Sequence, residues 1–325
     1  MDGNPIIQSA GLIIEDSCVK VHHIDVKQYG MKKICSVFLF ETPDAVAIVD
    51  TGTSDDFAAI RGYMKKHGID AAKVVYVVPS HFHFDHFGGG WVAWQSLVDS
   101  NPEVKVLTTR ATKDRLQDAS LHLQRAARTF GTGFVGKMQP LPEEAYHLVE
   151  PGAHIPLPGA DPGIGITLVP TPGHTADHVS PTLASNGRTI FTFLGEAGGT
   201  LFHSSKLVTF GTSMPPEYDS NAYIDSLERL IALQPRAVGF CHFGAVAGKE
   251  AVSTVLRENM AFTKFFKDFV KNQYERSGSV REVVERFIAE EAPKRTDWPH
   301  NDLLVKIVVA LVYGQLVDLG LKDPK

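Results

Sequence analysis

The first half of the chain alternates short apolar runs with glycine, proline and aspartate, which are residues typical of turns. The apolar runs are rich in β-branched residues, so each run is expected to form a strand. The predicted strands cover residues 12–14, 19–24, 34–40, 45–49, 74–78 and 104–107. Later runs of the same kind predict strands at 166–169, 189–193 and 237–241.

Helical patterns separate several of these strands. A helix is expected over residues 54–66, where Ser54 can cap the first turn and Gly68 can end the last turn. A long polar helix is predicted over 111–129. Residues 221–233 keep apolar side chains at helical spacing, which predicts another helix just before the last strand.

The pattern changes after Gly248, where three helices are predicted in succession, over residues 251–271, 279–291 and 301–319. The first of them carries an apolar face rich in phenylalanine, from Phe262 to Phe269. We therefore expect one domain over 1–249 and a helical extension over 250–325 that packs on it. The phenylalanine-rich face could close over a pocket of that domain.

Composition narrows the class of protein. With 43% hydrophobic and 21% charged residues in 325, the chain has the balance of a globular protein. A formal charge of −5 gives no electrostatic reason to expect nucleic acid or an anionic membrane as a partner. Three scattered cysteines do not form a disulfide framework, and the N-terminus does not resemble a signal peptide. A cytoplasmic protein with a small-molecule substrate is expected, and a homo-oligomer is left open.

The segment from His81 to Gly90 carries the strongest chemical signal. His81, His83, Asp85 and His86 lie within six residues, directly after a predicted strand. In an extended stretch, residues two apart point to the same side, so His81 and His83 can reach one metal. Asp85 and His86 follow as the chain turns and can face a second metal. Imidazole and carboxylate ligands without thiolate suit zinc, iron or manganese.

This segment resembles the signature of the metallo-β-lactamase superfamily, and the resemblance extends over about residues 11–248. It implies an α/β fold, a four-layer αββα sandwich, with the metal site at one edge. Three further landmarks follow in order. By this resemblance, Asp50 in IVDTG supports the metal site from behind the ligands. His174 in TPGHT binds the first metal, and His242 in GFCHFG binds the second.

One position departs from the superfamily pattern. An aspartate that bridges the two metals usually follows the strand after the His174 motif, and here the acidic residue at that place is Glu196, in GEAGG. The extra methylene lengthens the side chain by more than about 1 Å, whereas metal–oxygen distances tolerate errors of only about 0.2 Å. Glu196 must bind with its backbone set back, bind a single metal, or fail to bind. We favour a ligand, because glutamate is chemically competent.

The resemblance implies a dinuclear metal-dependent hydrolase with two divalent metal ions, for which zinc is favoured over iron or manganese. Bound water then ionises near pH 7 and attacks a carbonyl or phosphorus centre as hydroxide. Asp85 is the expected catalytic residue, because it can hold the second metal and orient the proton of the water. The expected metal ligands are His81, His83, Asp85, His86, His174, Glu196 and His242.

The substrate is less clearly indicated than the metal site. Nearby aromatic residues suggest an apolar pocket suited to a small ester, lactone, thioester or phosphoester, which includes phosphodiesters and phosphotriesters. The aromatic candidates are Phe82, Phe84, Trp91, Trp94, Phe202, Phe210 and Tyr218, with Met214 and His203 beside them. No basic patch that would select RNA or glutathione is evident. A mononuclear iron dioxygenase of the persulfide dioxygenase type is the alternative, and a non-catalytic metal-binding protein is a third.

Overall fold

Two seven-stranded sheets form the centre of the computed structural model, which describes residues 4–15, 18–298 and 301–324. The first sheet contains, in spatial order, β2 (Gly11–Glu15), β3 (Lys20–Asp25), β4 (Ser36–Glu41), β5 (Val46–Val49), β6 (Val74–Val78), β7 (Lys105–Thr108) and β8 (Tyr146–Leu148). The second contains β1 (Ile6–Ile7), β14 (Gly244–Ala247), β13 (Ala237–Phe240), β12 (Arg188–Phe193), β11 (Val179–Ser185), β10 (Ile164–Pro170) and β9 (His154–Pro156). Both sheets mix parallel and antiparallel pairs.

Aromatic side chains fill the space between the two sheets. Phe38 of β4 lies 5.1 Å from Phe191 and 5.3 Å from Phe193 of β12, measured between ring centroids. All three rings are fully buried. Alternate residues of each strand therefore point into a common core, which is why the predicted strands keep their apolar faces together.

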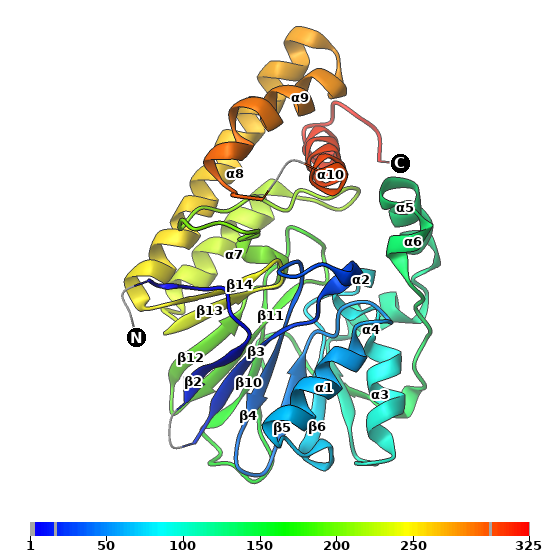
Figure 1. Cartoon of the computed structure of the whole chain (residues 1–325), viewed down its shortest axis with the longest axis vertical. Coiled ribbons are helices and arrows are strands. Elements are labelled where there is room, and N and C mark those ends of the chain that lie inside the picture. Colours follow the sequence, from blue (N-terminus) through cyan, green and yellow to red (C-terminus); the bar gives the residue numbers. More distant parts are fainter. Residues whose placement is uncertain (1–3, 16–17, 299–300, 325) are drawn as a thin grey trace.

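Helices cover the outer face of each sheet (Figure 1). On the first sheet, α1 (Phe57–His67) and α3 (Gly90–Val98) contribute buried side chains to one core cluster. On the second sheet, α7 (Ser220–Ala232) and the start of α8 (Lys249–Ser277) do the same. The order helix, sheet, sheet, helix confirms the predicted αββα sandwich.

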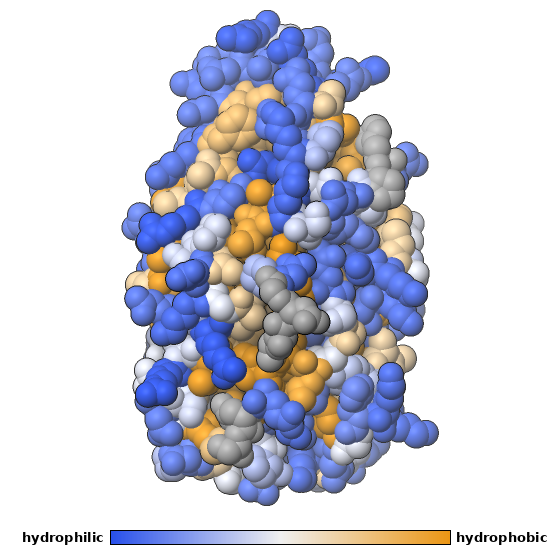
Figure 2. Space-filling model, turned by 60° about the vertical axis from the view of Figure 1, so that its left-hand side comes forward, coloured by the Kyte–Doolittle hydropathy of each residue, from blue (hydrophilic) through white to orange (hydrophobic). Residues whose placement is uncertain are grey.

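The C-terminal helices extend from one end of the sandwich. They comprise the long α8, α9 (Val280–Glu290) and α10 (Asp302–Asp318), which pack around Phe262, Phe266 and Phe287. Figure 1 shows α8 and α9 forming the tip of the molecule, with α10 beside α5 (Ser120–Phe130). In Figure 2 this tip is mainly hydrophilic, so the apolar faces of the helices are turned inward.

Two helix predictions were wrong in detail. The helix expected over 111–129 is two helices, α4 (Arg110–Gln117) and α5, because Asp118 adopts an extended conformation between them. Its carboxylate accepts a hydrogen bond from the Ser120 N–H at 3.0 Å, which starts a new helix instead of continuing the old one. The helix expected from Ser54 begins at Phe57, and the residue at its N-cap position is Asp56, whose side chain does not cap the helix but accepts the N–H of Thr53 before it.

Several short elements were not anticipated from the sequence. Strands β1, β8, β9, β11 and β14 had no prediction, since their runs are short or interrupted by polar residues. The remaining short helices are α2 (Phe84–Phe87), α6 (Thr132–Val135), η1 (Gln28–Gly30), η2 (Ala71–Lys73), η3 (Glu143–Ala145), η4 (Gly195–Gly198) and η5 (Ala292–Lys294). Within the described residues, no helix combines the length and the apolar character that crossing a membrane would need.

Gly314 sets how closely α10 approaches the sandwich. A Cβ atom at this position would lie 1.9 Å from the Ser213 carbonyl oxygen, which belongs to backbone and cannot swing away. We predict that Gly314→Ala lowers the free energy of unfolding by about 1–3 kcal/mol, despite the higher helix propensity of alanine. Urea denaturation followed by circular dichroism measures this change.

Gly62→Ala is the matched control for that measurement. Gly62 lies in α1, and a Cβ atom there would meet nothing within 4 Å. This variant should therefore gain about 0.5–1 kcal/mol from helix propensity alone. Equal effects of the two substitutions would show that α10 does not depend on the close approach at Gly314.

Candidate metal centre

The predicted ligands gather at one edge of the sandwich because each follows the C-terminal end of a strand. His81 follows β6 of the first sheet. His174, Glu196 and His242 follow β10, β12 and β13 of the second sheet. These three strands run in the same direction, so their C-terminal ends meet at one edge.

The loop after β6 is tightly folded, and three consecutive glycines make this possible. A Cβ atom on Gly88 would lie 2.0 Å from the Phe84 carbonyl oxygen, and one on Gly89 would lie 2.6 Å from the Thr53 carbonyl oxygen. On Gly90 it would meet the Phe87 ring at 2.3 Å. The glycines are therefore required by close packing around α2, which carries Asp85 and His86.

Three histidines form the first set of potential ligands. One ring nitrogen from each of His81, His83 and His174 lies within 4.8 Å of the other two. The Nε2 atom of His174 is 3.1 Å from the Nδ1 atom of His83. The fold therefore brings these three predicted ligands together.

Hydrogen bonds on the far side of the rings orient the nitrogens. His174 Nδ1 lies 2.7 Å from the Thr212 carbonyl oxygen, which can only accept, so Nδ1 carries the proton and Nε2 faces the set. His242 is arranged in the same way, with Nδ1 at 2.9 Å from the Ile34 carbonyl oxygen. Metal-binding histidines are commonly fixed by such a bond to their other nitrogen.

Asp50 lies behind the site, in the place that the family resemblance implies. Its carboxylate accepts the Ser80 N–H at 2.7 Å and the Ser80 hydroxyl at 2.8 Å. The Ser80 Oγ atom is thereby free to accept the Nδ1 proton of His81 at 3.0 Å, which leaves His81 Nε2 for the site. The Asp50 oxygen that accepts the Ser80 hydroxyl, Oδ2, also lies 3.6 Å from His86 Nδ1.

The second set combines imidazole and carboxylate groups. The Oε1 atom of Glu196 lies 3.2 Å from the Nε2 atoms of both His86 and His242. The Oδ2 atom of Asp85 lies 3.4 Å from His86 Nε2 and 3.6 Å from His242 Nε2. Four of the predicted ligands thus point at one another beside the first set.

Glu196 is held by its backbone as well as by its neighbours. Gly195 adopts a positive φ of 53°, and the Glu196 N–H donates to His178 Nε2 at 3.0 Å. The Glu196 carbonyl oxygen accepts from the Thr212 hydroxyl at 2.8 Å and the Tyr223 hydroxyl at 3.0 Å. His178 therefore helps to fix the backbone position of Glu196.

The buried carboxylates and imidazoles alter one another's protonation. Burial would raise the pKa of Glu196, but His174 and His242 beside it hold that pKa well below its ordinary value. Burial would likewise lower the pKa of His242, but the Glu196 and Asp85 carboxylates raise it to about 9. Burial and the neighbouring histidines keep the pKa of His81 well below its ordinary value. The three histidines of the first set are therefore neutral. The negative charge of the site comes from the two carboxylates of the second set.

The residues present fit a pair of divalent metal ions. His81 Nε2, His86 Nε2 and Glu196 Oε2 are buried and have no hydrogen-bond partner among the described residues. Leaving such groups without a partner costs free energy, unless a ligand restores the interaction. Nitrogen and oxygen donors in this combination suit zinc and other divalent ions.

Cys241 is a neighbour of the second set that the sequence did not indicate. Its Sγ atom lies within 4.8 Å of the ligand atoms of His86, Glu196 and His242. Burial and the nearby carboxylates raise the pKa of the Cys241 thiol well above its ordinary value. The side chain also packs in the core between the sheets, which favours a neutral thiol.

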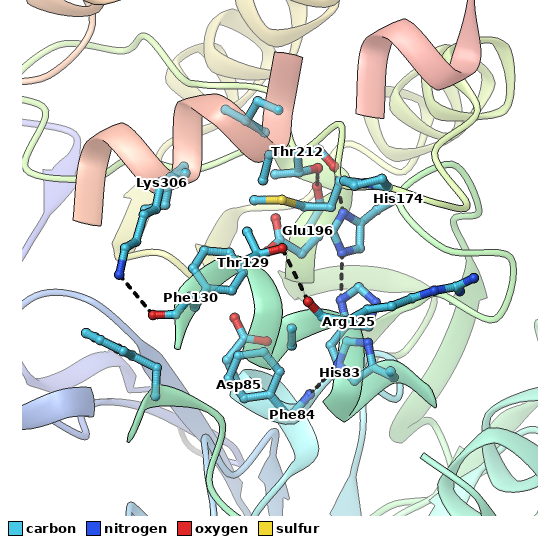
Figure 3. Close-up of a pocket in the computed structure, with 18 of the residues that line it drawn as sticks. His83, Phe84, Asp85, Arg125, Thr129, Phe130, His174, Glu196, Thr212 and Lys306 are labelled. Atoms are coloured by element: carbon cyan, nitrogen blue, oxygen red, sulfur yellow. Dashed lines mark hydrogen bonds between the residues drawn. The ribbon is translucent and has the colours of Figure 1, made fainter. Parts of the chain in front are cut away.

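A cavity of about 670 Å³ opens onto both sets, with His83, Asp85, His174 and Glu196 in its wall (Figure 3). This volume lies within the range typical of small-molecule sites. Helices α5 and α10 form the opposite side, where Lys306 Nζ donates to the Phe130 carbonyl oxygen at 3.0 Å. The helical extension therefore covers the cavity.

The structure corrects several expectations about the cavity wall. Phe82, Phe84, Phe202, Phe210 and Met214 line it as expected. Its lining does not include Trp91, Trp94, His203, Tyr218 or the phenylalanines of α8, and both tryptophans instead pack beneath the first sheet. The apolar residues that cover the cavity come from α10, including Leu303 and Ile307, and from α5, including Phe130.

Basic side chains reach this cavity, although the sequence showed no basic patch. Arg115, Arg125, Arg128 and Lys306 line it, from α4, α5 and α10. Arg115 is neutralised by Glu217, with Nη1 and Oε1 2.5 Å apart. These residues are spread over nearly 200 positions of sequence, so only the folded chain collects them.

His122 is a further cavity residue that the sequence did not reveal. Its ring stacks on His83 with centroids 4.3 Å apart and planes inclined by 5°. A single histidine in a predicted polar helix carries no signal of its own. The break at Asp118, which sets the direction of α5, was also not foreseen.

Comparison with known proteins agrees with this geometry. The family model described as the metallo-beta-lactamase superfamily matches residues 31–242. A metallo-beta-lactamase fold-containing protein of Sulfurisphaera tokodaii is 27% identical over 241 residues, which cover 71% of this chain and 81% of that protein. A probable metallo-hydrolase of Mycobacterium bovis is 24% identical over 255 residues, covering 67% and 76%.

Solved structures show the same fold. The crystal structure of an archaeal metallo-beta-lactamase superfamily protein from Sulfolobus tokodaii aligns with a TM-score of 0.62 and 21% identity. The alignment covers 91% of this chain and 97% of that chain. The similarity therefore includes most of the C-terminal helices as well as the sandwich.

Proposed function

Because the chain belongs to the metallo-beta-lactamase superfamily, we propose that it is a dinuclear metal-dependent hydrolase of a small apolar ester, lactone, thioester or phosphoester. One observation carries this proposal. Seven side chains with nitrogen or oxygen donors converge in two sets beside one cavity, five of them line it, and three of their buried donor atoms lack partners among the described residues.

The two sets divide the proposed ligands. His81, His83 and His174 would hold the first metal, because their inward nitrogens lie within 4.8 Å of one another. Asp85, His86 and His242 would hold the second metal. Glu196 contacts the second set through Oε1, and His174 of the first set is its strongest electrostatic neighbour. This position supports a carboxylate shared by both metals, with zinc favoured over iron or manganese.

Divalent metals at these sets would supply water activation and polarisation of the substrate oxygen. The protein contributes the placement of the groups around them. Asp85 is the proposed catalytic residue, because its carboxylate both touches the second set and lines the cavity. In that place the Asp85 carboxylate can accept a hydrogen bond from the attacking water. This bond would turn the lone pair of the water oxygen toward the substrate.

The cavity wall supports an apolar substrate. Phenylalanines from three segments and aliphatic residues of α10 make up much of the cavity wall. Burying apolar substrate surface there would contribute about 25 cal/mol per Å². Arg125 and Lys306 place positive charge in the same wall, which disfavours cationic substrates.

A substrate screen tests this function directly. The purified protein is assayed with chromogenic carboxyl esters, lactones, thioesters, phosphodiesters, phosphotriesters and β-lactams, with and without a chelator. We expect hydrolysis that is lost on chelation and restored by a divalent metal. Elemental analysis should find two zinc-like ions per chain, whereas one iron and oxygen consumption would instead support a mononuclear dioxygenase.

The double variant His81→Ala and His83→Ala should lose the first metal, because two of three proposed ligands disappear. Activity should fall by more than about 100-fold. Substituting a residue that only hydrogen-bonds to a metal ligand already lowers metal affinity or activity by about 10–100-fold, and here the ligands themselves are removed. Metal content is measured by mass spectrometry and stability by thermal unfolding. The control changes the exposed His67 and His154 to alanine and should keep both metals and the full rate.

Glu196→Asp separates a site adapted to glutamate from one that ignores this residue. The shorter side chain reaches more than about 1 Å less far, while the Glu196 backbone is held by His178, Thr212 and Tyr223. Activity should therefore drop although the superfamily's usual residue is restored. Glu196→Gln, which removes charge at constant size, should weaken second-metal binding about 10-fold or more. Unchanged metal content and rate in both variants would remove Glu196 from the site.

A further inference from the structure

The ring of His122 lies against the first histidine set without belonging to it. It stacks on His83 with centroids 4.3 Å apart and nearly parallel planes, and it lines the same cavity. His122 is not among the nitrogens that cluster within 4.8 Å around His81. Its place beside the set makes its hydrogen bonds relevant to whatever enters the cavity.

One nitrogen of the ring is already used. The backbone N–H of Phe84 points at His122 Nε2 over 3.2 Å. A backbone N–H can only donate, so Nε2 must present its lone pair and carry no proton. The neutral ring therefore carries its hydrogen on Nδ1, and this tautomer follows from the Phe84 bond alone.

The opposite nitrogen is free to act. Nδ1 of His122 has no hydrogen-bond partner among residues 4–15, 18–298 and 301–324. The ring is pinned on one face by His83 and at Nε2 by Phe84, so the N–H direction is fixed. A fixed donor beside a reactive centre contributes more than one that must be ordered first.

We infer that His122 is a substrate-positioning residue whose Nδ1–H donates a hydrogen bond to a carbonyl, carboxylate or phosphoryl oxygen held in the cavity. This role rests on the proposed hydrolase function. The donor lies on the His83 side of the site, so it would hold the substrate oxygen toward the first histidine set. Asp85 approaches the same cavity from the second set.

Two substitutions separate this role from a purely structural one. The amide nitrogen of asparagine lies as many bonds from Cα as Nδ1 does, so His122→Asn keeps the donor and loses the bond to Phe84. The amide oxygen of glutamine lies as far out as Nε2 does, so His122→Gln keeps the bond to Phe84 and loses the donor. If His122 has only a structural role, His122→Gln should lose less activity than His122→Asn. If His122 positions the substrate, His122→Asn should lose less activity than His122→Gln.

The test uses the full-length, metal-loaded protein with p-nitrophenyl butyrate as substrate and butyrate as a probe of oxygen binding. His122→Gln should lower kcat/KM and weaken butyrate binding about 10-fold, the effect of losing one hydrogen bond of about 1.4 kcal/mol. His122→Asn should stay within about 3-fold of the wild-type protein in both measurements, although its thermal stability falls further. His154→Asn, at an exposed site, is the control and should change neither.

Nitrogen NMR of ¹⁵N-histidine-labelled protein reports the tautomer independently of turnover. A protonated Nε2 on His122 would overturn the inference, as would a His122→Gln variant with wild-type kcat/KM and butyrate binding. If wild-type protein hydrolyses none of the screened substrates, the proposed function fails, and calorimetry with butyrate still decides the role of His122. Wild-type protein that neither hydrolyses the ester nor binds butyrate overturns the inference too.

Discussion

The hydrogen bonds between the buried Asp50 carboxylate and Ser80 hold the rest of the site in place. The carboxylate accepts two hydrogen bonds from Ser80, at the point where the chain leaves β6. The Ser80 carbonyl oxygen in turn accepts the Val179 N–H of the other sheet at 2.8 Å. Ser80 therefore connects a strand of each sheet and also orients His81. The histidine is aligned only when the two sheets have packed together. Hydrogen bonds to a charged acceptor are strong in such a dry environment.

A second constraint on the site is the packing interface between the sandwich and the helical extension. The segment that contains Thr212 and Ser213 serves both parts, since Thr212 holds His174 and Glu196 while Ser213 donates to the Leu311 carbonyl oxygen of α10 at 2.9 Å. A substrate that fills the cavity would thus contact α10, which is hydrogen-bonded to the same segment that holds His174 and Glu196. The helical extension and the candidate metal centre are therefore connected through this segment, although they lie far apart in the sequence.

The cavity has two chemically different sides. Imidazoles and carboxylates line one side, while α5 and α10 line the other with apolar and basic residues. Such a division orients an amphipathic molecule, because its polar reactive group and its apolar portion are each stabilised on only one side. His122 lies where the two sides meet, with its ring packed on a histidine of the polar side.

The family, the sandwich and the candidate metal ligands could be predicted from the sequence alone, because H-x-H-x-D-H spacing after a strand and the later Pro-Gly-His and Cys-His runs are local patterns. The sequence also placed Glu196 where a carboxylate was expected. Three features became evident only in the folded chain: Glu196 contacts His86 and His242, Cys241 lies beside them, and α10 rather than α8 covers the cavity. These outcomes depend on the direction in which helices leave the sheets and on close contacts such as Gly314 against Ser213. The contacts of Glu196 with His86 and of Gly314 with Ser213 join residues more than 100 positions apart, and no local pattern of side chains records them.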